Sequence, residues 1–261
     1  MKIVAVIPAR YESSRFPGKP LADICGKPMI WWVYQNCCKV ELLSEVYVAT
    51  DSECIQKACQ QYGIRTIMTS PDCLTGTDRC AEATMGMEAD IVVNVQGDEP
   101  LLEPDTIVRA IEPLVKDENL LVTNLMTKIN NPVDLVNVTV PKVITNEKGL
   151  GLYLTRAVAP YPKGSVEYVY YKQVCVYGFR PSALKFFWEF GQEKGKSKNE
   201  KIEDIEILRF IENGYQVQYV EANSETVAVD TPKDLERVRG IMEKCPRGGT
   251  GVDCLVTCLQ I

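Results

Sequence analysis

The chain opens with a run of five apolar residues at 3–7, and four of the five are β-branched. An apolar run without polar alternation is typical of a strand that is buried on both faces, as the strands of a parallel sheet are. Mostly apolar segments recur at 46–50 and 91–95, and the segments between them have helical patterns. This βαβαβ order predicts an α/β fold built on a doubly wound, mainly parallel sheet.

The expected elements alternate regularly up to residue 120 and less regularly beyond it. In the first part we expect strands at 2–7, 46–50, 65–68 and 91–95, and helices at 29–38, 52–62, 77–87 and 104–115. In the second part we expect β-structure at 121–128, 140–145, 151–155, 173–179, 216–220 and 226–229, and helices at 182–190, 202–212 and 232–244. The polar, lysine-rich stretch 191–201 is expected to be a mobile loop. The second part thus predicts a smaller, partly antiparallel subdomain.

Composition excludes several classes of function. The formal net charge of −6 argues against a general nucleic-acid binder, which would present a basic face. No apolar run approaches the ~18 residues of a membrane span, and the N-terminus lacks a signal-peptide pattern, so we expect a cytoplasmic protein without membrane contact. Eleven irregularly spaced cysteines fit reduced thiols. The absence of histidine removes Ser-His-Asp and Cys-His triads, which leaves carboxylates, cations, metals and positioning to perform any catalysis.

A basic loop follows the first strand directly. Arg10, Arg15 and Lys19 lie within ten residues, together with two serines and a Pro-Gly turn. Arginine offers planar forks for phosphate oxygens and lysine a compact charge. A solvated surface loop is the competing interpretation. The position after a buried strand, where α/β proteins bind ligands, favours a nucleoside triphosphate site.

Two aspartates follow other expected strands. Asp98 lies in the sequence QGDEP after the strand at 91–95, and Asp230 precedes the Thr-Pro pair that opens the last helix. A few carboxylates beside phosphate oxygens suit Mg²⁺. The competing interpretations are an acidic turn for Asp98 and a helix N-cap for Asp230. Asp230 can join Asp98 as a metal ligand only if the fold brings the two together.

Seven motifs give the chain a resemblance to a known family. Over about the first 245 residues, and in the same order, it resembles the 3-deoxy-manno-octulosonate (Kdo) cytidylyltransferases, or CMP-Kdo synthetases. The motifs are IPARYESSRFPGKPL, ATD, TGTDR, NVQGDEP, KVITNEKGLGLYLTRA, VYGFR and VDTPKDLERVR. The opening motif is shared with other sugar-acid cytidylyltransferases, whereas the combination of QGDEP and VDTPKDLE is more specific to the Kdo branch.

The resemblance implies a reaction and its requirements. CTP and an acidic sugar would give a CMP-sugar and pyrophosphate on a Rossmann-like, Mg²⁺-dependent, homodimeric enzyme, whose product serves lipopolysaccharide biosynthesis. The implied catalytic residues are Lys19, Arg15, Asp98 and Asp230, with Asp98 and Asp230 as metal ligands. The implied nucleotide-binding residues are Arg10, Ser13, Arg15, Lys19, Thr75, Gly76, Thr77 and Arg79. The implied acceptor-binding residues are Gln96, Arg156, Gln173, Tyr177, Glu203 and Glu206.

The resemblance also implies one nucleotidyltransferase domain over residues 1–245. Its nucleotide-binding part is expected at about 1–120, its acceptor-binding and dimerisation part at about 121–225, and a closing strand and helix at 226–245. Residues 246–261 form a tail to which we assign no role.

Two departures from the family pattern concern the acceptor. Gln173 stands where the family has a pocket histidine, and Ile207 where it has a pocket glutamine. Glutamine still forms hydrogen bonds but cannot become cationic near neutral pH. Sites built on hydrogen bonds discriminate strongly between acceptors. Alternatives to Kdo are therefore 8-amino-Kdo, another ulosonic acid, and a phosphonate or phosphate compound.

Two other functions compete with this interpretation. A nucleotidyltransferase acting on a sugar 1-phosphate would share the basic loop but usually opens with a glycine-rich segment. A noncatalytic nucleotide-binding protein should have lost Lys19, Asp98 or Asp230, and all three are present.

Overall fold

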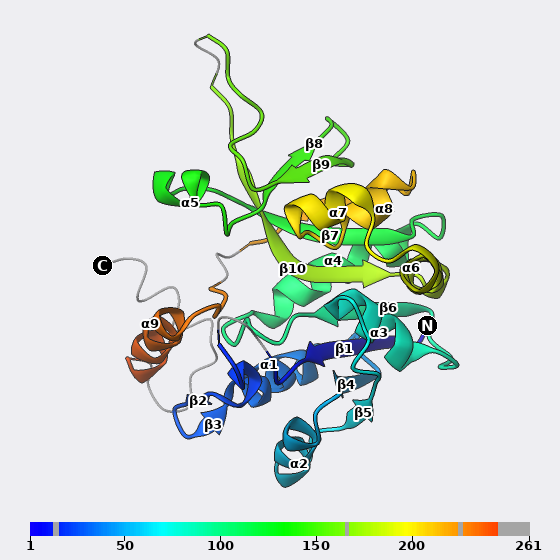
Figure 1. Cartoon of the computed structure of the whole chain (residues 1–261), viewed down its shortest axis with the longest axis vertical. Helices are drawn as coiled ribbons and strands as arrows, with labels where there is room; N and C mark the ends of the chain where they lie inside the picture. Colours follow the sequence, from blue (N-terminus) through cyan, green and yellow to red (C-terminus); the bar gives the residue numbers. More distant parts are fainter. Residues whose placement is uncertain (13–15, 165–166, 224–226, 245–261) are drawn as a thin grey trace.

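The computed structural model describes residues 1–12, 16–164, 167–223 and 227–244. One mixed sheet runs through the molecule in the order β11-β7-β10-β6-β1-β4-β5 (Figure 1). Its strands are β1 (Ile3–Ala9), β4 (Glu45–Thr50), β5 (Thr66–Met68), β6 (Ile91–Val95), β7 (Val122–Lys128), β10 (Tyr171–Phe179) and β11 (Val217–Glu221). An antiparallel extension adds β8 (Lys142–Thr145) and β9 (Gly151–Thr155), and β2 (Asp23–Ile24) and β3 (Lys27–Pro28) form a separate ribbon.

The strand directions confirm the predicted mixed, mainly parallel sheet. β1 pairs in parallel with β4 and β6, and β4 with β5. β10 is antiparallel to both β6 and β7, whereas β11 is parallel to β7. Strands from both parts of the chain therefore share one continuous set of hydrogen bonds.

The helices cover both faces of this sheet. They are α1 (Met29–Cys38), α2 (Glu53–Gln61), α3 (Gly76–Thr84), α4 (Pro104–Lys116), α5 (Pro132–Val136), α6 (Pro181–Lys194), α7 (Lys198–Glu203), α8 (Leu208–Glu212) and α9 (Pro232–Glu243), with a 3₁₀ turn η1 at Lys19–Leu21. Successive residues of β1 alternate between two cores. Ile3 and Ile7 pack with α1, α2 and α4, while Val4 and Val6 pack with α3, α6 and α8. Burial on both faces explains the apolar run that opens the chain.

A third, smaller core docks α9 against the start of α1. Ile24, Met29 and Leu101 pack there against Val229 and Leu235. The backbone N–H of Val229 donates to the carbonyl oxygen of Asp98 at 2.8 Å. The strand expected at 226–229 is wrong for 227–229, which form no strand, and Thr226 lies outside the described residues. This segment instead carries Asp230 to the end of β6.

The mobile loop expected at 191–201 and the helix expected at 202–212 are also wrong. α6 continues to Lys194, α7 begins at Lys198, and a left-handed Asp204 (φ 50°) separates α7 from α8. The lysines suggested a solvated loop. However, Ser197 and Glu200 form a capping box, and the Glu200 side chain is fully buried against Arg209.

Three further expectations meet the structure here. The eight cysteines within the described ranges are all free, as expected for reduced thiols. Among the helices in the described part of the chain, none is long and apolar enough to cross a membrane. The tail at 246–261 lies outside the described residues.

Candidate active site

A cavity of about 800 Å³ lies at the carboxyl ends of β1 and β6, at the sheet edge where the sequence predicted a ligand crevice. Arg10 and Asp98 follow these two strands, and Thr75 and Gly76 begin α3 beside them. Gln173, Cys175 and Tyr177 come from β10, Arg156 follows β9, and Asp230 precedes α9. The charged residues that line the cavity are Arg10, Asp98, Glu99, Asp134, Arg156, Lys172, Lys196, Asp204, Glu206, Asp230, Asp234 and Arg237.

Lys19 joins the two predicted metal ligands. Its ammonium lies 2.8 Å from Asp98 Oδ2 and 3.5 Å from Asp230 Oδ1. Although burial opposes the charge, these carboxylates hold the pKa of Lys19 above its ordinary value. The condition set for Asp230, closeness to Asp98, is therefore met.

The local backbone explains how this cluster forms. Gly18 has φ 70°, a left-handed conformation that glycine adopts without strain, and it turns the chain into η1 so that Lys19 faces Asp98. Gly97 passes so close to β1 that a Cβ there would lie 3.2 Å from the Pro8 carbonyl oxygen. Both glycines bring the basic loop and the acidic loop together.

The cluster also supplies a fit test for Mg²⁺. Two carboxylates already converge on one cation, since the Lys19 ammonium occupies the space between them. Within the described ranges, no group of three or more cysteine, aspartate or glutamate side chains is arranged to hold a metal. Water and phosphate oxygens would complete the shell, which is how Mg²⁺ is usually held. Asp98 and Asp230 therefore fit this ion.

The predicted nucleotide-binding residues divide into two groups. Arg10 lines the cavity and donates from Nη2 to the Cys73 carbonyl oxygen at 2.5 Å; Thr75 and Gly76 also line it. Thr77 and Arg79 lie behind this surface. Arg79 is fully buried and donates to Asp51 Oδ2 at 2.8 Å. Ser13 and Arg15 lie outside the described residues.

Glu206 links the start of α3 to Gln96 in the cavity wall. Its Oε2 accepts from the backbone N–H of Thr77 at 3.0 Å, and its Oε1 accepts from Gln96 Nε2 at 3.2 Å. Burial raises the pKa of this carboxyl, and the hydrogen bonds from Thr77 oppose that effect. Glu206 and Gln96 form one polar wall of the cavity.

The Arg156 guanidinium is held by hydrogen bonds to backbone carbonyl oxygens, which are neutral partners. It donates to the carbonyl oxygens of Glu203 at 2.5 Å, Asp204 at 3.0 Å and Val138 at 3.0 Å. The Glu203 carboxylate instead accepts from Thr155 Oγ1 and from the Arg156 backbone N–H, both at 2.8 Å, and does not appear among the lining residues. Carbonyls hold the Arg156 side chain in place without neutralising its charge, so it remains suited to an anionic acceptor.

The two departures from the family pattern differ in position. Gln173 lines the cavity beside Tyr177, and its Nε2 donates to Asn124 Oδ1 at 2.9 Å. Ile207 is 1% exposed, packs in the core on the α6 side and does not line the cavity. The hypothesis that position 207 faces the acceptor is therefore wrong, and only Gln173 carries the argument about specificity.

Sequence reasoning missed two lysines of the acceptor side. Lys172 lines the cavity and pairs with Asp134 at 2.9 Å, and Lys196 lines it and pairs with Asp204 at 2.9 Å. Lys172 had no signal, because strand alternation predicts that it lies on the opposite face of β10 from its neighbour Gln173. Lys196 lay in the stretch expected to be a mobile loop.

Comparison with known proteins agrees with the fold. A doubly wound sheet with a cavity at the carboxyl ends of its parallel strands is typical of nucleotide-binding α/β proteins, and the relatives place this chain among the nucleotidyltransferases, enzymes that transfer nucleotidyl groups. A family model described as Cytidylyltransferase matches residues 4–226. The chain therefore belongs to the cytidylyltransferase family.

Relatives within this family are similar over nearly the whole chain. A 3-deoxy-manno-octulosonate cytidylyltransferase of Geotalea uraniireducens is 43% identical over 255 residues, which cover 94% of this chain and all of the relative. One from Geobacter metallireducens is 42% identical, covering 91% of this chain and 96% of the relative. The predicted resemblance to the Kdo cytidylyltransferases is thus confirmed.

Solved structures agree as well. A CMP:2-keto-3-deoxy-manno-octonic acid synthetase, solved with CTP, superposes with a TM-score of 0.86 at 38% identity, covering 94% of this chain and 99% of that one. A 4-diphosphocytidyl-2C-methyl-D-erythritol synthase of Anaerococcus prevotii has a TM-score of 0.61 at 15% identity, covering 93% and 97%. The second likeness establishes the shared fold alone.

Proposed function

We propose that this enzyme transfers CMP from CTP to Kdo, or to a closely related acidic sugar, and releases pyrophosphate. The observation that supports this most is that Asp98 and Asp230, which Lys19 joins, line the same cavity as Arg156 and Glu206. One end of the cavity suits a triphosphate and the other an anionic polyol. The family and the relatives named above agree with a cytidylyltransferase that acts on Kdo.

The residues divide the work between the two substrates. Lys19 and Arg10, joined by Arg15 of the same loop, would neutralise charge on the leaving pyrophosphate. Gln96 and Glu206 would orient the acceptor hydroxyl for in-line attack on the α-phosphorus. Transfers of this kind depend mainly on positioning and charge neutralisation. A histidine base is not required, which fits a chain without histidine.

Asp98 and Asp230 would hold Mg²⁺ in this site. The chemistry that the ion supplies when bound is polarisation of the α-phosphoryl group and a lower pKa of the acceptor hydroxyl. Because the Lys19 ammonium lies between these two carboxylates here, it would move aside when the ion binds and would then be available to a phosphate oxygen. Asp98→Asn should raise the Mg²⁺ concentration needed for half-maximal activity, whereas Asp90→Asn, remote from the cavity lining, should not.

A different acceptor is the second candidate, and Gln173 favours it. Its amide reaches the cavity where the family pattern has a histidine. An amide offers a donor and an acceptor but no positive charge. 8-Amino-Kdo, which carries its own cation, and other ulosonic acids or phosphorylated acceptors therefore belong in the test.

The test is Mg²⁺-dependent release of pyrophosphate from CTP with Kdo, 8-amino-Kdo, a sialic acid and a phosphonate. Turnover of Kdo at the highest kcat/KM supports the main proposal, and turnover of another acid supports the second candidate. If another acid is the preferred acceptor, Gln173→His should move the preference toward Kdo. Absence of CTP binding would overturn both.

We also propose a homodimer that works in the cytoplasm, where CTP is available. Exposed apolar side chains occur on α5, on the loop that links α5 to β8, on β9 and on the segment that links β9 to β10, and these parts of the chain project from the sheet in Figure 1. They are Val133, Val136, Val138, Leu152, Val158, Tyr161, Tyr168 and Val169. Large exposed apolar patches mark interfaces, and a second copy of this chain is the proposed partner.

A further inference from the structure

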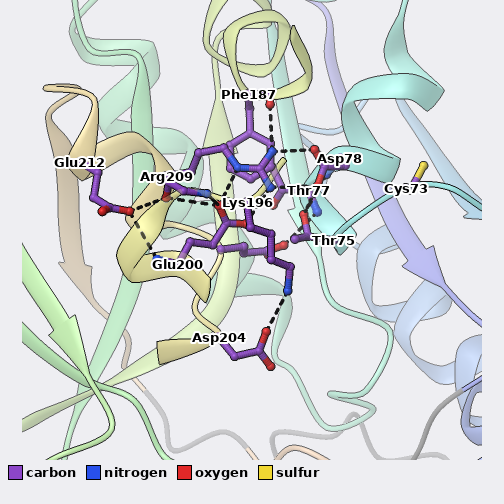
Figure 2. A network of polar contacts seen from close by, with 12 residues as sticks. Cys73, Thr75, Thr77, Asp78, Phe187, Lys196, Glu200, Asp204, Arg209 and Glu212 are labelled. Atoms are coloured by element: carbon purple, nitrogen blue, oxygen red, sulfur yellow. Dashed lines mark hydrogen bonds and ion pairs between the residues drawn. The ribbon is translucent and has the colours of Figure 1, made fainter. Parts of the chain in front are cut away.

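Behind the cavity lies a fully buried arginine with two buried carboxylate partners. Arg209 of α8 binds Asp78 through Nη1 to Oδ1 at 2.7 Å and through Nη2 to Oδ2 at 3.2 Å. It binds Glu200 through Nε to Oε2 at 2.8 Å and through Nη2 to Oε1 at 2.6 Å. The Phe187 ring lies 3.7 Å from the guanidinium carbon (Figure 2). Planar, two-sided contacts of this kind are possible for arginine and not for lysine.

The two carboxylates belong to two segments, distant in sequence, that both contribute residues to the cavity lining. Asp78 lies in the first turn of α3 and accepts from Thr75 Oγ1 at 2.7 Å; Thr75 is the N-cap that lines the nucleotide side. Glu200 lies in α7, which ends just before the lining residues Ile205 and Glu206. Arg209 therefore ties the start of α3 to the turn between α7 and α8.

The same two segments meet again at the cavity wall, through the side chain of Glu206. Glu206 accepts from the backbone N–H of Thr77, the residue before Asp78. Any shift of Asp78 relative to Arg209 would thus move Thr77 relative to Glu206. The buried Asp78–Arg209 pair and the Thr77–Glu206 hydrogen bond at the cavity wall therefore hold the same two segments together.

The neighbouring helix leaves space for this arrangement. A Cβ at Gly191 of α6 would lie 2.7 Å from Arg209 Nη1 and 2.8 Å from Asp78 Oδ1. Both atoms belong to the buried ion pair, so neither can move without breaking it. Only glycine at this position allows Arg209 and Asp78 to meet.

Stability alone is a weak reason for this network. Burying charges costs free energy that their attraction often only offsets, and apolar side chains of similar volume would pack at least as well. What a hydrogen-bonded ion network adds is a fixed geometry, since each partner must occupy one position.

We propose that Arg209 is a positioning residue, which acts through Asp78 and Glu200 to hold the nucleotide-binding start of α3 and the acceptor-binding turn at Glu206 in fixed register. It contacts neither substrate. The kinetic test of this inference rests on the proposed function, because it measures the transfer of CMP from CTP to the acceptor. A misplacement of about 1 Å remote from the reacting atoms can cost about a hundred-fold in rate.

Two variants test this without removing the site residues. Arg209→Lys keeps the charge and loses the fork, and Gly191→Ala displaces the pair without changing any charge. Arg180→Lys is the matched control. The Arg209 guanidinium donates to the Phe187 carbonyl oxygen, and the Arg180 guanidinium likewise donates to the carbonyl oxygens of Leu114 and Asp90, but Arg180 lies outside the cavity lining and its named partners are not carboxylates. Each is assayed well below its own Tm, so that the folded fraction is the same.

The expected result is a fall in kcat/KM of about a hundred-fold in Arg209→Lys and Gly191→Ala, with higher KM for both CTP and the acceptor. Arg180→Lys should lower Tm and leave kcat and KM unchanged. Folded variants with wild-type kcat and both wild-type KM values would overturn the inference. Absence of turnover by the wild type with every acceptor would instead count against the proposed function.

Amide hydrogen exchange tests the inference without an activity assay, because it measures the protection of the two segments directly. In Gly191→Ala, and in Arg209→Lys where it folds, the segments 75–79 and 204–208 should lose protection together, while β1 and β6 keep theirs. Uniform loss over the whole chain, or loss in only one of the two segments, would overturn the inference.

Discussion

Glu206 is a carboxylate whose surroundings disfavour its charge. Burial raises its pKa, while the hydrogen bonds from Thr77 limit the effect. A group whose folded-state pKa lies above its unfolded value binds its proton more tightly when folded, so stability falls as pH rises from the unfolded pKa through the folded pKa. The ionised form of Glu206 therefore lowers the free energy of unfolding relative to the protonated form.

We expect Glu206→Gln to separate stability from activity. The variant should have a higher Tm than the wild type at pH 7.5, and the difference should shrink as pH is lowered toward 5, because the raised pKa makes the folded wild type take up a proton more readily than the unfolded chain. Its kcat/KM should fall at least about ten-fold, since the acceptor loses a charged partner. Thermal unfolding across this pH range measures the first effect and pyrophosphate release the second; a Tm difference that grows at low pH would contradict the argument.

The ionised form of Lys19 stabilises the folded protein, in contrast to the ionised form of Glu206. Asp98 and Asp230 raise its pKa, so its contribution to stability is complete at neutral pH and is lost only as pH rises through that raised pKa, above 10.5. We expect Lys19→Met to lower Tm at pH 7.5 and to reduce kcat by about a hundred-fold or more, the usual cost of removing one preorganised electrostatic contact.

Lys57→Met is the control for Lys19→Met. Lys57 forms an exposed i,i+4 pair with Glu53 at 3.1 Å, so its loss should change neither Tm nor kcat measurably. Equal kinetics in Lys19→Met and wild type would remove Lys19 from the proposed machinery.

At the scale of elements, Gly178 fixes how closely α4 packs on β10. A Cβ at this position would lie 2.5 Å from Thr123 Oγ1 and 2.7 Å from both the Ala110 carbonyl oxygen and Leu114 Cδ1. Two of these contacts involve α4 itself, so the helix would have to move away from the strand.

We expect Gly178→Ala to destabilise the protein by about 1–3 kcal/mol, the range for overpacking in a core. Gly240→Ala is the matched control. It lies in α9, where a Cβ would meet nothing, so better helix propensity should stabilise by about 0.5–1 kcal/mol. Chemical denaturation measures both, and a neutral Gly178→Ala would show that α4 has freedom to shift.

The element that sequence reasoning missed, α7, shows where local patterns fail. Four lysines between 191 and 201 resemble a solvated loop. The residue that decides the conformation is Glu200, which pairs with Arg209 in the next helix and, through it, meets Asp78 from a distant segment. A partner that lies 131 positions away cannot be read from the local pattern.

At the scale of the whole molecule, the proposed dimer gives a test of its own. Leu152 and Val136 are 56% and 68% exposed on the projecting part of the fold. If that part is an interface, Leu152→Asp and Val136→Asp should each convert the dimer to a monomer in light scattering. Val115→Asp, an exposed apolar site on α4 outside this group, should leave the mass unchanged. A monomeric wild type would contradict the proposal.

By itself the sequence determined the alternation of strands and helices, because β-branched runs buried on both faces and amphipathic helices are local patterns. It also predicted that Arg10, Lys19 and Asp98 lie near a ligand site, since they follow buried strands, and left Asp230 dependent on its distance from Asp98. Only the tertiary structure decided that Asp230 meets Asp98 across Lys19, that Ile207 belongs to the core, and that Arg209 bridges two cavity walls. These are contacts between distant segments, and their energies depend on burial and geometry that appear only when the chain is folded.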